Sequence, residues 1–211
     1  MRPIRSALLA VSAGTIAALS GCQGHGNYTS AALDDATARM SSIQAGTRWD
    51  LAHQQFLAGD LNKALKNVEA SIELHDAVGQ SHVLHGRILM ELGQLEPALD
   101  AFDAAIALDP SVADPHYYRG IVFERFSEFV DAHESYETAA LLEPSDPQYA
   151  VAAAEMLIQL DLLDKAEAML LERSSHHQHN AGVKQTLGHI ALLRGDALTA
   201  VDYFREARLL A

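Results

Sequence analysis

Small and large apolar residues recur with a period of 34 over residues 45–211, about four-fifths of the chain. The clearest series is alanine, at Ala64, Ala98, Ala132, Ala166 and Ala200. A second series of small residues lies twelve positions earlier, at Ala52, Gly86, Gly120, Ala154 and Gly188. Self-similarity at a fixed period of this length is typical of arrays built from one repeated supersecondary unit.

Each 34-residue unit is predicted to contain two helices joined by a tight turn. Between the two small-residue series lie turn formers, at Gly59, Gly93, Ser127, Asp161 and Gly195. A large apolar residue follows each alanine by four positions, at Val68, Phe102, Tyr136, Leu170 and Phe204, and a small one often comes next, at Ser71, Ala105, Ala139 and Ala207. Spacings of three and four place these side chains on one helix face, so each unit is predicted to be a helical hairpin.

The strongest units resemble the tetratricopeptide repeat. The matching residues are Gly86, Gly93, Ala98, Phe102, Ala105 and Pro110 in one unit, and Gly120, Ala132, Tyr136, Ala139 and Pro144 in the next. The resemblance implies an all-α fold, a solenoid of five hairpins over 45–78, 79–112, 113–146, 147–180 and 181–211. The physics agrees, because one hairpin cannot bury its own apolar face and must stack on its neighbours.

The outer units depart from this pattern. Asp76 and Gln178 stand where Pro110 and Pro144 end the middle units, and Arg173 interrupts the apolar stripe of the fourth unit. We therefore expect units two and three to be the rigid platform and the junction between units four and five to be the weakest point.

The amino end has the layout of an exported lipoprotein. Arg2 and Arg5 precede an apolar stretch from Ala7 to Leu19, which is too short to span a bilayer core that needs about 20 residues. Leu19-Ser20-Gly21-Cys22 then resembles a bacterial lipobox, and Cys22 is the only cysteine. Residues 1–21 are thus predicted to be a lipoprotein signal peptide, and Cys22 the lipidated residue that anchors the chain to a membrane.

The segment 22–44 is expected to link this anchor to the array. Gln23 follows the cysteine where an Asp is the usual inner-membrane retention signal in enteric bacteria, so the resemblance favours the outer membrane, facing the periplasm. Glycines and asparagine predict a flexible tether over Gln23–Ser30. Ala31–Gln44 is predicted to form a helix capped by Thr29 or Ser30.

The charge of the chain argues against nucleic acid as a partner. With 28 acidic and 15 basic residues, the formal net charge is −13. Proteins that grip phosphates need clustered Lys and Arg, and the repeat region has no basic run. The acidity fits a well-solvated helical surface.

The resemblance implies that proteins or peptides bind in a concave groove lined by the first helix of each hairpin. The exposed positions there would be Trp49, His53, Phe56, Val83, Arg87, Met90, Tyr117, Ile121, Glu124, Val151, Glu155, Gln185 and His189. This mixed apolar and aromatic surface suits an apolar segment or an amphipathic helix. Packing between adjacent hairpins is the alternative role for each of these residues. Repeats that clamp a C-terminal carboxylate use Lys and Asn at these positions, which are nearly absent here.

No pattern in the sequence indicates catalysis, a cofactor or a metal. There is neither a nucleophile motif nor a phosphate-binding glycine loop. His176, His177 and His179 form a cluster in a predicted loop, without a neighbouring carboxylate or cysteine, and read as solvated. His82 and His85, three apart on one predicted helix, read as surface or core residues.

The leading hypothesis is a non-enzymatic, membrane-anchored scaffold that binds partner proteins in envelope assembly. Lipobox and array together are similar to the tetratricopeptide lipoproteins of pilus, secretion and outer-membrane assembly machines. Two alternatives follow from the last hairpin, where nothing covers Phe204 and Leu210. The array is either the targeting part of a longer enzyme, which a stop codon directly after Ala211 would exclude, or it self-associates through this end, which a monomeric mass in light scattering at high concentration would exclude.

Overall fold

The computed structural model describes residues 26–172 and 180–211. The predicted leader, Cys22 and the histidines of 176–179 lie outside this range. Within it the chain forms ten helices and no strand, and it divides into two compact units at Arg39 and Met40. The second unit, from Met40 to Ala211, contains the array and confirms the predicted all-α solenoid.

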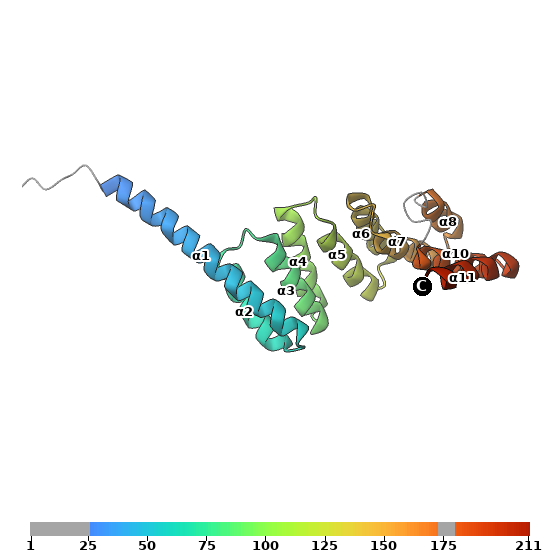
Figure 1. The fold of residues 1–211 in the computed structure, drawn as a ribbon, viewed down its shortest axis with the longest axis horizontal. Coiled ribbons are helices and arrows are strands. Elements are labelled where there is room, and N and C mark those ends of the chain that lie inside the picture. The colour runs from blue at the N-terminus through green and yellow to red at the C-terminus, as the bar shows by residue number, and fades with distance from the viewer. Residues whose placement is uncertain (1–25, 173–179) are drawn as a thin grey trace, which may run out of the picture. The chain divides into compact units, whose positions relative to one another are not determined.

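The helices of the array pair as antiparallel hairpins that follow one another in chain order (Figure 1). Their bounds are α1 Gly26–Leu57, α2 Leu61–Leu74, α3 Gly79–Glu91, α4 Leu95–Leu108, α5 Ala113–Arg125, α6 Phe129–Leu142, α7 Pro147–Gln159, α8 Leu163–Glu172, α10 Ala181–Leu193 and α11 Ala197–Leu210. The first helices α3, α5, α7 and α10 begin at the residues where the sequence analysis begins its units. Each first helix packs on its own second helix and on the second helix of the preceding hairpin.

The longest helix, α1, differs from the sequence expectation. It begins at Gly26 and runs to Leu57 without interruption, so the residues predicted to end a flexible tether are its first turn. The same helix continues through residue 45, where the first predicted unit begins. Once a helix is nucleated, each added residue gains a hydrogen bond at little further cost, so Ala31 and Ala32 can extend the helix back through poorer helix formers.

The turns inside the hairpins share one conformation. All five residues of the predicted turn series have a positive φ: 78° at Gly59, 76° at Gly93, 62° at Ser127, 59° at Asp161 and 84° at Gly195. The backbone N–H of Gly93 donates to the carbonyl of Met90, and that of Gln94 donates to the carbonyl of Leu89. This pair of bonds is the Schellman motif, which satisfies the last carbonyls of a helix and reverses the chain.

Where the two helices of a hairpin cross, a small residue faces a large one. A Cβ atom added at Gly86 would lie 2.5 Å from the ring of Phe102, and one added at Gly120 would lie 2.6 Å from the ring of Tyr136. In the first and fourth hairpins the large residue is aliphatic and the small one is alanine: Ala52 clusters with Val68, and Ala154 with Leu170. At this crossing position, glycine occurs where a ring approaches the backbone, and alanine occurs where the large residue is aliphatic.

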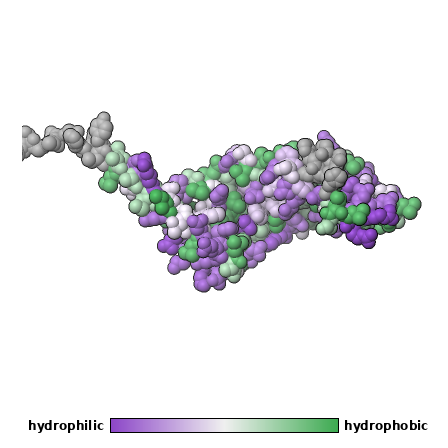
Figure 2. Space-filling model, viewed as in Figure 1, coloured by the Kyte–Doolittle hydropathy of each residue, from purple (hydrophilic) through white to green (hydrophobic). Residues whose placement is uncertain are grey.

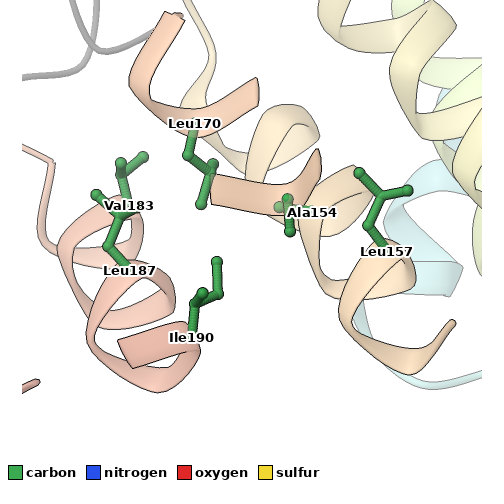
Figure 3. Packing of buried hydrophobic residues seen from close by; sticks show 7 residues of the cluster. Ala154, Leu157, Leu170, Val183, Leu187 and Ile190 are labelled. Atoms are coloured by element: carbon green, nitrogen blue, oxygen red, sulfur yellow. The ribbon is translucent and has the colours of Figure 1, made fainter. Parts of the chain in front are cut away.

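Successive hairpins share their core. Figure 3 shows side chains from three helices meeting at one junction: Ala154 on α7, Leu170 on α8 and Ile190 on α10. All three are almost fully buried. The second helix α8 has ten residues in the described range, whereas α4 and α6 have 14 each.

The pairing of glycine with a ring can be tested by replacing Gly86 and Phe102 of the second hairpin with alanine and leucine, the pair found in the fourth hairpin. We expect Gly86→Ala to lower the free energy of unfolding by about 1–3 kcal/mol through overpacking, and Phe102→Leu to lower it by a similar amount by leaving a void. In the double variant the added methyl fills that void, so urea denaturation should show a favourable coupling of about 1 kcal/mol.

Gly46→Ala is the control, because nothing lies within 4 Å of a Cβ at that helical position. It should stabilise the protein by about 1 kcal/mol through helix propensity. Strictly additive losses in the double variant would contradict the contact between Gly86 and Phe102.

Candidate functional site

The first helices place most of the predicted groove residues at the surface of the array. Twelve of the thirteen side chains are half-buried or exposed. Met90 is the exception, because it is only 5% exposed and packs in a core cluster with Phe102 and Val122. Its carbonyl accepts a hydrogen bond of 2.9 Å from Nη1 of Arg125, so Met90 joins two hairpins and is corrected from a groove residue to a core residue.

One recess of about 440 Å³, the N-terminal recess, brings together groove residues of the first two hairpins. Trp49 and His53 come from α1, and Val83 and Arg87 from α3. The remaining lining residues come from α3, α4, α5 and the segment between α4 and α5: Gly79, Gln80, Leu84, Ala105, Asp109, Val112, Asp114 and Pro115. The rings of Trp49 and His53 stack at 5.1 Å, which presents a flat aromatic wall.

Arg87 is held between two rings at the inner side of this recess. Its guanidinium carbon lies 5.0 Å from the ring centre of Phe56 and 4.9 Å from that of Tyr118. Tyr118 in turn stacks on the buried ring of Phe102 at 5.7 Å. Both aromatic faces attract the cation, so the side chain is fixed by contacts from α1 and α5.

Beyond Arg87, an aromatic cluster fills the middle of the row of first helices. Tyr117 contacts the rings of Tyr118, Tyr136 and Tyr149 at centroid distances of 5.6, 5.4 and 5.1 Å. Tyr117 and Ile121 also pack against the core clusters between the third and fourth hairpins. For these two predicted groove residues the structure favours the alternative role of packing between hairpins.

A second recess of about 320 Å³, the C-terminal recess, contains all four groove residues predicted for the last two hairpins. They are Val151 and Glu155 on α7, and Gln185 and His189 on α10. Gly182, Thr186 and Phe204 complete the lining. The four residues that the repeat positions predicted therefore line one recess in the structure.

The C-terminal recess contains one carboxyl group, that of Glu155. Desolvation raises the pKa of the Glu155 carboxyl above its usual value, and the charge of Glu124 adds to the rise. The carboxylate of Glu124 accepts a hydrogen bond of 2.7 Å from the hydroxyl of Tyr136. Burial, and then this hydrogen bond, raise the pKa of Tyr136, which keeps its proton on the hydroxyl at neutral pH.

A larger groove, of about 820 Å³, lies between the second helices α6 and α8 and was not expected from the sequence. Its apolar lining includes Leu141, Leu157 and Met169, and its charged residues include Glu134 and Lys165. One of its residues could have been singled out from the sequence, because Leu141 lies outside the apolar stripe of its helix. The structure shows that this side chain is 66% exposed.

The last hairpin leaves an apolar surface uncovered. The large residues at the Phe204 position in the other hairpins are 0–1% exposed, whereas Phe204 is 37% exposed. Leu198 and Leu209 on the same helix are 83% and 77% exposed. Elsewhere apolar and polar residues alternate over the visible face of the array (Figure 2).

The described residues contain no group of three or more His, Cys, Asp or Glu side chains arranged to hold a metal ion. His82 and His85 have separate local partners. Nε2 of His82 lies 2.9 Å from the carbonyl oxygen of Asp76, and Nε2 of His85 lies 4.0 Å from Oε1 of Glu69. Burial lowers the pKa of His85 below its usual value, and the charge of His82 lowers it further.

In residues 26–172 and 180–211, no helix is both long and apolar enough to cross a membrane.

Comparison with known proteins identifies the repeat. The family model for the TPR repeat matches residues 86–125, which span α3, α4 and α5. No curated protein sequence matches the chain.

Solved structures share the fold at low sequence identity. Pseudomonas aeruginosa pilF superimposes with a TM-score of 0.70 at 12% identity, over 81% of this chain and 78% of that one. MamA from Desulfovibrio magneticus RS-1 gives 0.68 at 18% identity, over 79% and 94%. YrrB, described as a TPR protein with an unusual peptide-binding site, gives 0.63 at 16% identity, over 87% and 91%.

Proposed function

Because the chain carries the tetratricopeptide-repeat fold, we propose that it is a scaffold that binds a segment of another protein along its first helices. The observation that carries this proposal is the pair of recesses built from the predicted groove positions. Each is lined by first helices of neighbouring hairpins, and aromatic residues lie between them. A segment that reached both recesses would contact residues of all five hairpins.

The chemistry of the N-terminal recess fits an apolar or aromatic anchor of such a segment. Trp49 and Val83 are half-buried and line the recess. Tryptophan is among the residues that carry most of the binding energy at interfaces when water is excluded from them. The peptide-binding site of YrrB, a protein with the same fold, supports a similar use of this one.

The proposed setting is a bacterial cell envelope, with the chain held to a membrane by lipid on Cys22. The lipobox carries this part of the proposal. Two or three acyl chains would bury many methylene groups, each worth about 0.8 kcal/mol, and attachment would be permanent. Gln23 after the cysteine favours the outer membrane facing the periplasm.

Within the envelope, we place the protein among the adaptors that assemble pilus or secretion machinery. The proposal rests on the combination of anchor and groove, and pilF of Pseudomonas aeruginosa has the same fold. Self-association through α11 stays the alternative, favoured by the exposed ring of Phe204. The array as the targeting part of a longer enzyme is the other alternative.

Site-specific photocrosslinking in intact cells tests the use of the groove. A photoreactive amino acid at Val83 in the N-terminal recess, or at Gln185 in the C-terminal recess, should crosslink to the same partner protein. Lys66 on α2 and Glu96 on α4 are exposed on second helices and serve as matched controls. Adducts from the control positions alone would contradict the proposal.

Replacement of Cys22 tests the anchor. Cys22→Ser removes the thiol that receives the lipid, so the protein should move from the membrane fraction to the soluble fraction and lose labelling by radioactive palmitate. Wild-type protein that fractionates as soluble and unlabelled would refute the anchor, while the groove proposal would stand on the crosslinking result.

A further inference from the structure

The second-helix groove is the space of about 820 Å³ between α6 and α8, and none of the residues predicted for the first-helix groove lines it. Core residues belong to its lining, since Leu157 is 5% exposed and the half-buried Met169 packs against two core clusters. Leu162, directly before α8, also lines it and is 37% exposed. The groove therefore connects the core with solvent-exposed apolar side chains.

The repeat pattern does not account for the exposed apolar residues of α6. Val130 and Leu141 line the second-helix groove and are 54% and 66% exposed. The equivalent residues in α2 and α4 are polar or small: Asn62, Glu73, Glu96 and Ala107. In α11, leucine occupies both positions, on the uncovered surface of the last hairpin. Exposed apolar residues that lie together with polar neighbours mark interaction sites in soluble proteins, so the groove is a candidate binding surface.

Acidic side chains outnumber basic ones in the second-helix groove. Four carboxylates and one ammonium group line it: Glu134, Glu137, Asp146, Glu172 and Lys165. Glu137 lies 3.5 Å from Nε2 of His133, and Asp146 accepts a hydrogen bond from the backbone N–H of Gln148. Because the chain also has a net charge of −13, this surface repels a second copy and an anionic lipid surface, and it attracts a cationic partner.

We propose that the second-helix groove binds a cationic amphipathic helix of another protein. A helix of this kind buries its apolar residues, at positions i, i+3, i+4 and i+7, in a hydrophobic groove. These residues would pack against Leu141 and Met169, and lysines or arginines beside them would lie near Glu134 and Glu172. Charge complementarity of this type speeds the encounter and selects the partner. The inference goes beyond the proposed function, because it uses second helices and requires no contact with the first.

A recess on other second helices provides an internal comparison. It has a volume of about 720 Å³ and lies mainly on α2 and α4. It contains the carboxylates of Glu69, Glu73 and Asp100, but Ile72 is its one branched aliphatic residue. If charge alone attracted a cationic helix, this recess would bind it as well as the second-helix groove does.

Binding of paired peptides to the full chain tests the inference. The probe is a labelled, end-blocked peptide of about four helical turns, with Leu at the i, i+3, i+4 and i+7 positions and Lys elsewhere. Its twin has Glu in place of every Lys. In fluorescence anisotropy we expect the Lys peptide to bind about tenfold more tightly or better, and equal binding of the twins would contradict the inference.

An apolar variant tests whether the groove itself holds the peptide. Leu141→Ser should weaken binding of the Lys peptide about tenfold, because the leucine would no longer be buried by the ligand. The side chain is exposed in the free protein, so the fold does not depend on it. Leu57→Ser, at a leucine of α1 that is 71% exposed, is the matched control and should change nothing. Unchanged binding by Leu141→Ser would overturn the inference.

Two double variants with the same change in net charge separate local from general electrostatics. Glu134→Lys with Glu172→Lys reverses two exposed charges of the second-helix groove and should weaken the Lys peptide about tenfold. Glu69→Lys with Glu73→Lys reverses two exposed charges of the recess on α2 and α4 and should change binding about twofold or less. Equal weakening by both would show attraction by net charge alone and would refute the site.

A photoreactive residue on the apolar face of the Lys peptide locates the bound peptide. Adducts are expected on α6 and α8. Adducts on α3 or α10 would overturn this inference and leave the proposed use of the first helices standing, whereas failure of the crosslinks from Val83 and Gln185 would leave this inference standing.

Two further measurements distinguish the other occupants. We expect no binding to phosphatidylglycerol vesicles and the same mass in light scattering for wild type and Leu141→Ser. Vesicle binding, or a dimer, that is lost with Leu141→Ser would assign the groove to lipid or to a second copy and would overturn the inference.

Discussion

The close contact between a small residue and a large one at each hairpin crossing determines the rest of the array. At Gly86 the ring of Phe102 takes the space of a Cβ atom, so the two backbones approach closely and the ring is fully buried. This fixes the spacing of first and second helices. Glycine opposite a ring, or alanine opposite an aliphatic side chain, occupies the crossing of each hairpin.

The same stacking creates the candidate site. First helices that pack on two second helices bury one side, and their other sides form a continuous row of surface positions. Aromatic residues that join hairpins, such as Tyr118, reach this surface and position Arg87. Loss of the ring of Phe102 would therefore loosen Tyr118 and, through it, the guanidinium of Arg87.

Much of the array could be predicted because each repeat is defined by nearby residues and by steric requirements, such as a small side chain at the helix crossing. The turn series was identifiable because a positive φ favours glycine, and its period carried the prediction through Ser127 and Asp161, where glycine is absent. The C-terminal recess followed from repeat positions alone. Met90 was wrongly placed because the direction of a side chain at the helix end depends on α5. The start of the first helix was predicted at Ala31 and lies at Gly26, because propensity says little about extending a helix that already exists. The groove between α6 and α8 depends on the distance between helices that do not adjoin in sequence, which no periodicity encodes.

Hydrogen exchange followed by mass spectrometry tests the central claim most directly, namely that each hairpin is stabilised by its neighbours on both sides. The account predicts the slowest exchange in α3 to α6, faster exchange in α11, whose Phe204 ring is 37% exposed, and the fastest in residues 26–39. Slowest exchange in α11, or uniform protection from residue 26 to residue 211, would contradict it.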